Sequence, residues 1–304
     1  MKVAVGKAPR MHIAAPVVFA QRRLALAHGR HLDIGPKARI MGIVNVTPDS
    51  FSDGGQFANV DAAVSAARAM ADEGADIVDI GGESTRPGAD PVTAIEEQRR
   101  VLPVIEALAD RGGQGPLLSI DTYRAETARL ALKAGAHLVN DVWGLQREPK
   151  IANVAADAGA CICIMHNGRD RTPRTDPVAD QFAWFDASLT IARTAGIATD
   201  RILVDPGFGF AKDVAGNLAL MGRFAELHGL GLPLLAGTSR KRFIGAITGR
   251  DVDGRDAGTA ATSVLLRMAG AAVFRVHTVA INRDGLAIAD AMVQWSLSRD
   301  PDHA

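Results

Sequence analysis

The sequence predicts an α/β protein, a single (β/α)8 TIM barrel with a short N-terminal hairpin or cap. Short, almost entirely apolar runs alternate with longer segments whose apolar residues recur every three or four positions. Such runs are typical of parallel strands covered by helices, because a parallel strand needs a crossover to return to the same edge. Eight of these units fit a closed eight-stranded barrel of roughly 250 residues.

The eight expected strands are the runs 39–46, 77–81, 117–122, 138–141, 161–166, 202–206, 234–239 and 273–278. Amphipathic segments between them include 61–73, 94–110, 125–134, 180–194, 217–228 and 259–269. An open, doubly wound sheet is the alternative fold. The chain has neither of the glycine-rich phosphate motifs that such sheets often carry, which favours the barrel.

The domain organisation is simple, because no linker or shift in composition divides the chain. Residues 1–16 are expected to form an N-terminal extension and residues 299–304 a short tail. The barrel is expected to occupy residues 17–298, with residues 17 to about 37 forming a hairpin across its floor.

Charge and composition narrow the choice of partner. The 304 residues contain 34 Lys plus Arg and 34 Asp plus Glu, so the formal net charge is zero. This balance gives no bulk attraction for nucleic acid or an anionic membrane and favours a small-molecule substrate. No apolar run reaches the roughly 18 residues of a membrane span. Cys161 and Cys163 are expected to be buried free thiols on one strand, which indicates a reducing, cytoplasmic location.

Polar residues stand at the end of almost every expected strand, where a barrel of this kind carries its active site. They are Asn45, Asp79, Glu83, Asp121, Asn140, Asp141, His166, Asp205, Ser239, Arg240, Lys241, Arg275 and His277. Any one of the Asp, Asn or Ser residues could simply cap the following helix. Their convergence from eight strands is better explained by a binding site.

Two loops at this face are longer than a tight connection requires. Residues 47–55 and 81–88 are rich in Gly, Pro, Ser and Thr, and they carry Phe51 and Arg86. Long loops at a catalytic face commonly close over a bound substrate. We therefore expect two mobile lids.

Seven motifs at these positions resemble those of the dihydropteroate synthase family. In order they are MGIVNVTPDSFSDGG (41–55), DIGGESTRPG (79–88), SIDT (119–122), NDV (140–142), DPGFGF (205–210), SRK (239–241) and RVH (275–277). The resemblance covers residues 20 to 298. It implies an enzyme of folate synthesis that joins 6-hydroxymethyl-7,8-dihydropterin diphosphate to p-aminobenzoate and releases diphosphate and 7,8-dihydropteroate. Sulfonamides, which imitate p-aminobenzoate, are then expected to target this enzyme.

The resemblance assigns the pterin to Asp121, Asn140, Asp205 and Lys241, with Met165 forming a wall of the pocket. A pterin presents a guanine-like edge of N–H donors beside a carbonyl. Such an edge requires a carboxylate that accepts paired donors, an amide, and a cation near the carbonyl. Asp205 is the expected partner of the paired N–H groups, because an ionised carboxylate accepts two bonds at once.

The resemblance also implies a site for the leaving diphosphate. Asn45 would hold a Mg²⁺ on it, while Arg86, Arg275 and His277 would donate to its oxygens. Together with Lys241, the residues Asn45, Arg275 and His277 form the implied catalytic set. An arginine inside a barrel could instead form a structural ion pair, but its place at the end of the eighth strand favours phosphate binding.

The p-aminobenzoate positions implied by the resemblance are Phe51, Thr85, Pro87, Phe210 and Ser239. The aromatic amine needs no base to attack a cationic pterin, so the absence of a Ser-His-Asp arrangement is expected. Positioning and exclusion of water would do the remaining work. The family further implies a homodimer packed through its late helices.

One segment departs from the family pattern. The chain has Met-His-Asn-Gly-Arg-Asp at 165–170, where many members have Met-His-Met followed by a Gly-Pro element. Arg169, Arg171 and Arg174 in this loop are expected to be solvated; a contact with diphosphate or a partner is the alternative. Two other functions stay open, a pterin-dependent corrinoid methyltransferase and a catalytically silent pterin-binding paralogue.

Overall fold

The computed structural model describes residues 16–47, 56–84, 91–109 and 115–298. Its centre is a parallel sheet of eight strands, which run in the order β8-β7-β6-β5-β4-β3-β10-β9. They are β3 (Arg39–Asn45), β4 (Ile77–Gly81), β5 (Leu117–Asp121), β6 (Leu138–Asp141), β7 (Cys161–Met165), β8 (Ile202–Asp205), β9 (Leu235–Ala236) and β10 (Val273–Val276). A parallel bridge between Val204 and Leu234 joins the two ends of the sheet. The sheet is therefore a nearly closed barrel, and the open-sheet alternative is wrong.

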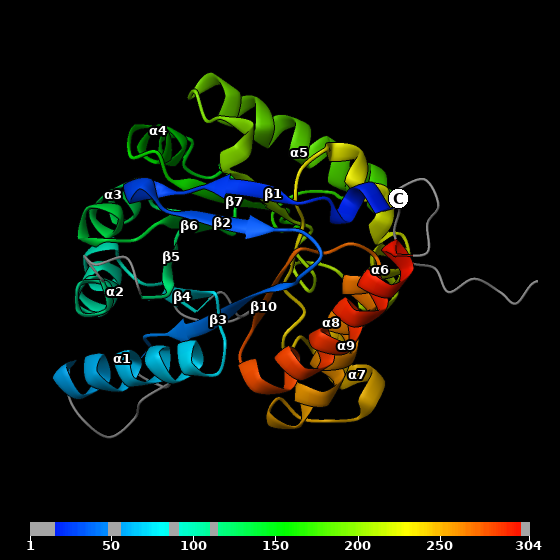
Figure 1. The fold of residues 1–304 in the computed structure, drawn as a ribbon. Helices are drawn as coiled ribbons and strands as arrows, with labels where there is room; N and C mark the ends of the chain where they lie inside the picture. The colour runs from blue at the N-terminus through cyan, green and yellow to red at the C-terminus, as the bar shows by residue number, and fades with distance from the viewer. Residues whose placement is uncertain (1–15, 48–55, 85–90, 110–114, 299–304) are drawn as a thin grey trace, which may run out of the picture.

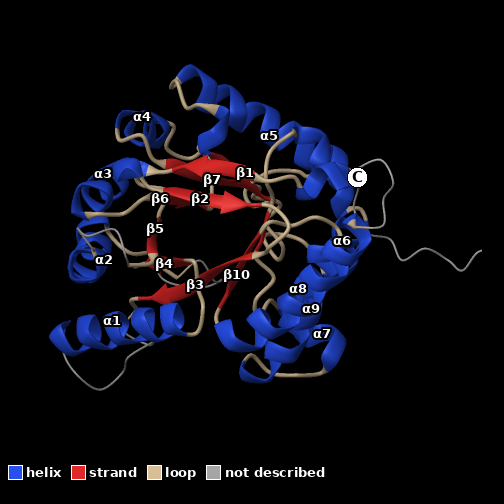
Figure 2. Ribbon diagram, viewed as in Figure 1, coloured by secondary structure: helices blue, strands red, loops and turns tan. Residues whose placement is uncertain are grey.

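Helices surround the strands (Figure 1; Figure 2). They are α1 (Gln56–Asp72), α2 (Ala94–Leu108), α3 (Ala125–Ala134), α4 (Lys150–Asp157), α5 (Pro177–Thr194), α6 (Val214–Gly222), α7 (Arg242–Thr248), α8 (Asp256–Met268) and α9 (Val279–Leu297). The segments of α4, α7 and α9 were not among the amphipathic segments recognised in the sequence. The expected helix at 217–228 is divided into α6 and a 3₁₀ helix at Phe224–Leu230.

Local sequence explains where several helices begin. The side chain of Asp176 accepts hydrogen bonds from the amides of Val178 and Ala179, and Pro177 occupies the first turn of α5. Asp213 caps α6 in the same way by accepting from the amide of Gly216. These caps fix the points at which the two preceding loops, both at the mouth of the barrel, must end.

An antiparallel hairpin of β1 (Arg22–Ala25) and β2 (His31–Ile34) covers the floor of the barrel, as expected. Its apolar side chains form one buried cluster with those at the amino ends of the barrel strands. The cluster comprises Leu24, Leu26, Leu32, Ile34, Met41, Ile77, Leu117, Leu138, Cys161, Cys163, Leu203, Leu235 and Val273. The two cysteines are free and fully buried, which confirms that expectation. The floor is thus closed by apolar packing.

A second and larger cluster lies between the barrel and its helices. Outward-facing strand residues such as Val78, Leu118 and Ile162 are fully buried there. Because successive side chains of a strand point to opposite faces, these strands are buried on both sides, which explains their nearly continuous apolar sequence. Among the described helices, none combines the length and apolar character needed to cross a membrane.

Candidate active site

A cavity of about 960 Å³ opens at the carboxyl ends of the barrel strands. Its lining includes seven residues to which the family resemblance assigns a role, which are Asn45, Asp121, Phe210, Ser239, Lys241, Arg275 and His277. They come from β3, β5, β10 and the loops after β8, β9 and β10. The barrel therefore brings together residues that are up to 232 positions apart in the chain, from Asn45 to His277.

Three expected pterin residues lie behind this cavity. Asn140, Met165 and Asp205 are only 3%, 3% and 5% exposed. Met165 packs with Val142 and Phe210 in a small apolar cluster, so an apolar wall stands beside the polar groups. Four other expected residues, Phe51, Thr85, Arg86 and Pro87, lie outside the described residues, and their roles stay predictions.

Arg275 is the centre of an ion-pair network inside the mouth. Its Nε donates to Asp79 Oδ2 at 2.6 Å and its Nη2 donates to Asp121 Oδ2 at 2.7 Å. Asp79 Oδ2 also accepts from Asn140 Nδ2 at 3.0 Å. Asp79 is fully buried. In this arrangement the single positive charge of Arg275 is shared between two carboxylates, so its expected contact with diphosphate requires it to share or change these partners.

Burial shifts the pKa values of the ionisable groups around Arg275. Desolvation raises the pKa of Asp121 to about 7, although the Arg275 cation opposes the rise. Desolvation also lowers the pKa of Lys241 to about 8; Arg275 adds to this fall, and Asp205 opposes it. Both groups therefore titrate close to neutral pH, as is common for residues that bind or transform a substrate.

Asp205 is held by the loop that follows β8. Its Oδ1 accepts from the amide of Gly207 at 2.7 Å. Burial raises the pKa of Asp205, whereas this hydrogen bond and the Lys241 cation act to lower it. Gly207 has a φ of +66°, and a Cβ there would lie 2.0 Å from the carbonyl oxygen of His166. The close approach of the two loops therefore requires glycine at this position.

Phe210 lies beside two cations. Lys241 Nζ is 4.2 Å from the centre of its ring and Arg169 Cζ is 4.9 Å from it. The stem of Lys241 passes Gly209, where a Cβ would lie 3.0 Å from Lys241 Cδ. An aromatic ring flanked by cations suits a flat, anionic aromatic ligand.

Ser239 and His277 contact each other across the mouth. Ser239 Oγ lies 2.9 Å from His277 Nδ1 and accepts from the His277 amide at 3.1 Å. The sequence assigned Ser239 to p-aminobenzoate and His277 to diphosphate. Because the two side chains touch, the expected sites for p-aminobenzoate and diphosphate must adjoin each other at Ser239 and His277.

The loop after His166 differs from the expectation of a solvated segment. Arg171 donates to both carboxylate oxygens of Asp180, at 2.8 and 2.5 Å, and Arg169 lines the cavity. Of the three arginines, Arg174 is exposed, as expected, and Arg169 and Arg171 are half-buried. The expectation was wrong for these two, because Arg171 pairs with the buried Asp180 and Arg169 lies against Phe210.

The mouth of the barrel has oxygen ligands of the kind that Mg²⁺ prefers. A Cβ at Gly81 would lie 3.6 Å from Asp121 Oδ2 and 3.7 Å from Asn45 Oδ1, so these oxygens face the same space. Among the described residues no cluster of three His, Cys, Asp or Glu side chains could hold a metal. Mg²⁺ commonly binds through one or two protein oxygens together with substrate phosphates. Asn45 therefore fits a Mg²⁺ that is carried by diphosphate.

Sequence reasoning left two residues of this region without a role. Asp79 was recognised only as a polar strand end, although it binds both Arg275 and Asn140. Lys212 was not recognised, although it lies within hydrogen-bonding distance of three groups at the mouth. A charged residue directly after a glycine-rich apolar loop was the available signal for Lys212.

Comparison with known proteins identifies the family. A family model described as "Pterin binding enzyme" matches residues 41–277. Dihydropteroate synthase of Bacillus subtilis is 46% identical over 243 residues, covering 80% of this chain and 84% of that protein. The Clostridium difficile enzyme solved with pteroic acid shares 44% identity and a TM-score of 0.82, covering 86% and 98% of the two chains. The Xanthomonas albilineans enzyme solved with 4-aminobenzoic acid shares 43% identity and a TM-score of 0.83, covering 93% and 100%. The chain therefore belongs to the dihydropteroate synthase family of pterin-binding enzymes.

Proposed function

We propose that this protein transfers the pterin-methyl group of 6-hydroxymethyl-7,8-dihydropterin diphosphate to p-aminobenzoate, giving 7,8-dihydropteroate and diphosphate. The observation that carries the proposal is the convergence of Asp121, Lys241, Arg275 and their neighbours on one cavity in a chain that shares 42–46% identity with dihydropteroate synthases. One solved relative was determined in the presence of pteroic acid and another with 4-aminobenzoic acid.

The pterin is proposed to bind deep in the barrel. Asp205, Asn140 and Asp121 offer carboxylate and amide groups to its N–H edge, and Lys241 offers a cation near its carbonyl. Met165 lies in the apolar cluster with Phe210 and provides a face for the ring. Because these groups are held by buried hydrogen bonds before a ligand arrives, little reorganisation would be needed on binding.

Cleavage of the bond between the pterin methylene and the diphosphate oxygen leaves positive charge on the pterin and added negative charge on the diphosphate. Arg275, His277 and Arg86 are proposed to donate to the diphosphate oxygens, and Asn45 to hold a Mg²⁺ there. When bound, the metal would neutralise charge on the leaving group. The amine nitrogen of p-aminobenzoate then forms the new bond to the methylene and loses a proton.

The aromatic amine is proposed to lie against Phe210 and Ser239, under the two loops that carry Phe51, Thr85 and Pro87. Closure of these loops would exclude water, which would otherwise capture the cationic pterin. Arg169, which lies beside Phe210, is proposed to supply positive charge near the carboxylate of p-aminobenzoate.

A direct assay tests the reaction. The purified protein, mixed with pterin diphosphate, p-aminobenzoate and Mg²⁺, should release diphosphate and dihydropteroate in equal amounts. Binding of the pterin without any product would favour the corrinoid methyltransferase alternative. Complementation of cells that lack their own synthase separates an active enzyme from a silent paralogue, because a silent protein would be expressed without restoring growth.

Two substitutions test the division of the pocket. Asp205→Ala should weaken pterin binding by about 1–3 kcal/mol for each donor left without its acceptor. Phe51→Leu should raise the KM for p-aminobenzoate, and alter inhibition by sulfonamides, while the pterin KM stays near that of the wild type. Equal effects of both variants on one substrate would contradict the division.

We also propose a homodimer that packs through α8 and α9. Leu265 in α8, and Ile288 and Trp295 in α9, are 60%, 69% and 53% exposed, which is unusual for large apolar side chains. Light scattering should give the mass of two chains, and Ile288→Lys should shift it toward one. Ile95→Lys, at a 64% exposed position on α2, is the control that should leave the mass unchanged.

A further inference from the structure

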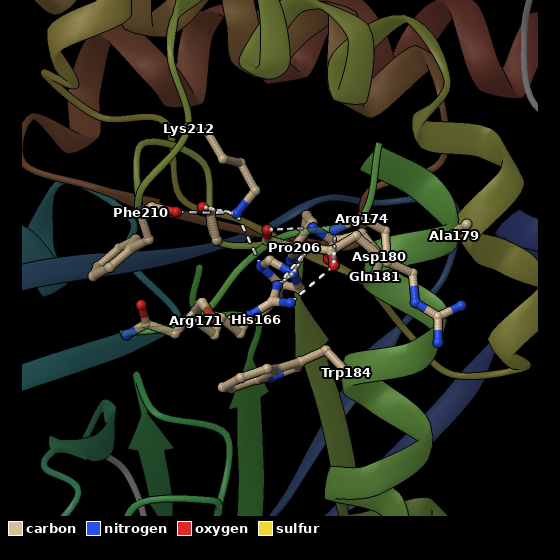
Figure 3. Close-up of polar contacts among 12 residues, drawn as sticks. His166, Arg171, Arg174, Ala179, Asp180, Gln181, Trp184, Pro206, Phe210 and Lys212 are labelled. Atoms are coloured by element: carbon tan, nitrogen blue, oxygen red, sulfur yellow. Dashed lines mark hydrogen bonds and ion pairs between the residues drawn. The ribbon is translucent and has the colours of Figure 1, made fainter. Parts of the chain in front are cut away.

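The ammonium group of Lys212 lies between the two loops that follow β7 and β8. Its Nζ donates to the carbonyl oxygen of Gly207 at 2.8 Å and approaches that of Phe210 at 3.4 Å. The same Nζ lies 3.0 Å from His166 Nδ1 (Figure 3). Within the part of the chain that the structure describes, no carboxylate forms an ion pair with Lys212. Its contacts are therefore with loop backbone and an imidazole.

The contacts of His166 make it an acceptor for this ammonium group. Burial lowers the pKa of His166 to about 3, so the ring is neutral near pH 7. Burial lowers the pKa of Lys212 to about 7, and in its charged form Nζ can only donate, so Nδ1 is then the acceptor of this contact. On the other side of the ring, Nε2 lies 3.0 Å from Asp180 Oδ2 and 2.7 Å from Arg171 Nη2. Arg171 also donates to both oxygens of the Asp180 carboxylate.

The loop that Lys212 binds has little other regular support. Gly207, Gly209 and Ala211 all have positive φ values, of 66°, 79° and 51°, so helix or strand hydrogen bonds cannot continue through it. Asn217 of α6 accepts from the amide of Gly209, and Lys212 binds the carbonyls on either side. The Gly207 carbonyl also accepts from the Phe210 amide at 3.2 Å, so loss of Lys212 removes the shorter of its two hydrogen bonds and should loosen this loop.

We infer that Lys212 is a positioning residue that fixes the loop of residues 206–212, and through it Phe210, against the neighbouring loop at His166. The inference rests on the proposed function, since Phe210 is proposed to contact p-aminobenzoate. Asp205 stands on β8, where it pairs with Met165 of β7 and its carbonyl oxygen accepts from the His166 amide at 2.8 Å, so its position does not depend on this loop alone. Removal of the Lys212 donor is therefore expected to disturb p-aminobenzoate more than the pterin.

Steady-state kinetics of Lys212→Met provide the first test. The KM for p-aminobenzoate should rise about tenfold, the KM for pterin diphosphate by no more than about twofold, and Lys212→Arg should recover most of the difference. Lys133→Met, which removes an exposed lysine of α3, is the matched control and should change neither constant. An unchanged KM for p-aminobenzoate, or an equal rise in both constants, would overturn the inference.

Hydrogen–deuterium exchange supplies a readout that does not depend on activity. Amides of residues 206–213 should exchange faster in Lys212→Met, while those of the barrel floor stay as in the wild type. Should Lys212→Met fail to fold, Lys212→Gln keeps a neutral donor of similar reach and should give a smaller change in the same direction. Unchanged exchange in this loop in a folded variant contradicts the positioning role. A wild-type protein without synthase activity would instead contradict the proposed function, whatever the exchange result.

Discussion

The floor and the mouth of the barrel are made by the same strands, but the floor has apolar side chains and the mouth has charged ones. At the floor, side chains such as Leu117, Leu138 and Leu203 pack against the hairpin in an apolar cluster. At the mouth, the strands end in Asp79, Asp121 and Arg275, which form ion pairs in a buried setting. Apolar packing stabilises the fold whether or not a ligand is bound. Burial of a charge costs desolvation free energy, which an opposite charge nearby must offset. The comparison indicates that the floor serves stability alone, whereas the mouth must keep its buried charges paired in order to carry a binding site.

The largest effect is expected from Arg275→Met at the mouth. This change leaves the buried Asp79 and Asp121 carboxylates without their cation, at a cost of about 3–5 kcal/mol in the free energy of unfolding. Urea unfolding measures the loss, and enzyme assays should show that activity falls as well. Arg129→Met is the control, because its pair with Glu126 is more than half exposed and worth less than about 1 kcal/mol.

A slightly smaller loss of stability, without loss of function, is expected from Leu203→Ala at the floor. Leu203 is fully buried, so its removal leaves a cavity that costs about 2–5 kcal/mol. Below the unfolding transition both KM values should equal those of the wild type. A selective change in either KM would show that the floor and the mouth are coupled, which breaks the comparison.

The pH dependence of stability should arise at the mouth. Because the pKa of Asp121 is raised to about 7, the folded protein binds more protons there than the unfolded chain does. The contribution of Asp121 to stability should therefore decline as the pH rises from about 4 to 7, by at most about 1.4 kcal/mol per pH unit. Buried His166, with its pKa lowered to about 3, acts in the opposite direction, so the contribution of Asp121 is the difference between the wild type and Asp121→Asn. Urea unfolding across that range measures the slope, and Asp121→Asn should reduce it. An identical slope in the variant would assign the titration to another group.

The smallest effect is expected from Arg169→Gln, which tests whether the p-aminobenzoate site at the mouth extends as far as Arg169. Loss of the cation beside Phe210 should raise the KM for p-aminobenzoate by about 2- to 30-fold, equivalent to about 0.5–2 kcal/mol. Arg174→Gln removes an exposed arginine of the same loop and should leave this KM unchanged. Equal effects of the two variants would indicate a general charge effect rather than a contact.

The sequence was most informative where structure depends on near neighbours. The eight apolar runs became the eight strands, and helices such as α2 and α3 lie where their spacing predicted. It was less informative for α7, where only seven residues leave too short a pattern to recognise. The terminal segments 1–16 and 299–304 stay a prediction, as do the homodimer, the Mg²⁺ at Asn45 and the cytoplasmic location.

In the site, too, the sequence predicted which residues stand at strand ends but not which of them contact each other. Seven of the expected residues line one cavity, because the carboxyl ends of parallel strands must meet. The partners of Arg275 could not be predicted, since Asp79 and Asp121 stand 196 and 154 positions away in sequence. The contacts of Arg169 and Lys212 also depend on how two loops turn toward each other, and no periodicity encodes that turn.

By itself, the sequence determined the barrel, its apolar floor and the set of polar groups at its mouth, because alternation of side chains and the polarity of strand ends are local properties. Tertiary structure alone decided which of these groups are joined. Closure of the barrel places Arg275 of β10 between carboxylates of β4 and β5. Close approach of the loops after β7 and β8 places Lys212 on His166. Hydrogen bonds and ion pairs act over a few ångströms, so they are fixed only when distant segments reach their final positions.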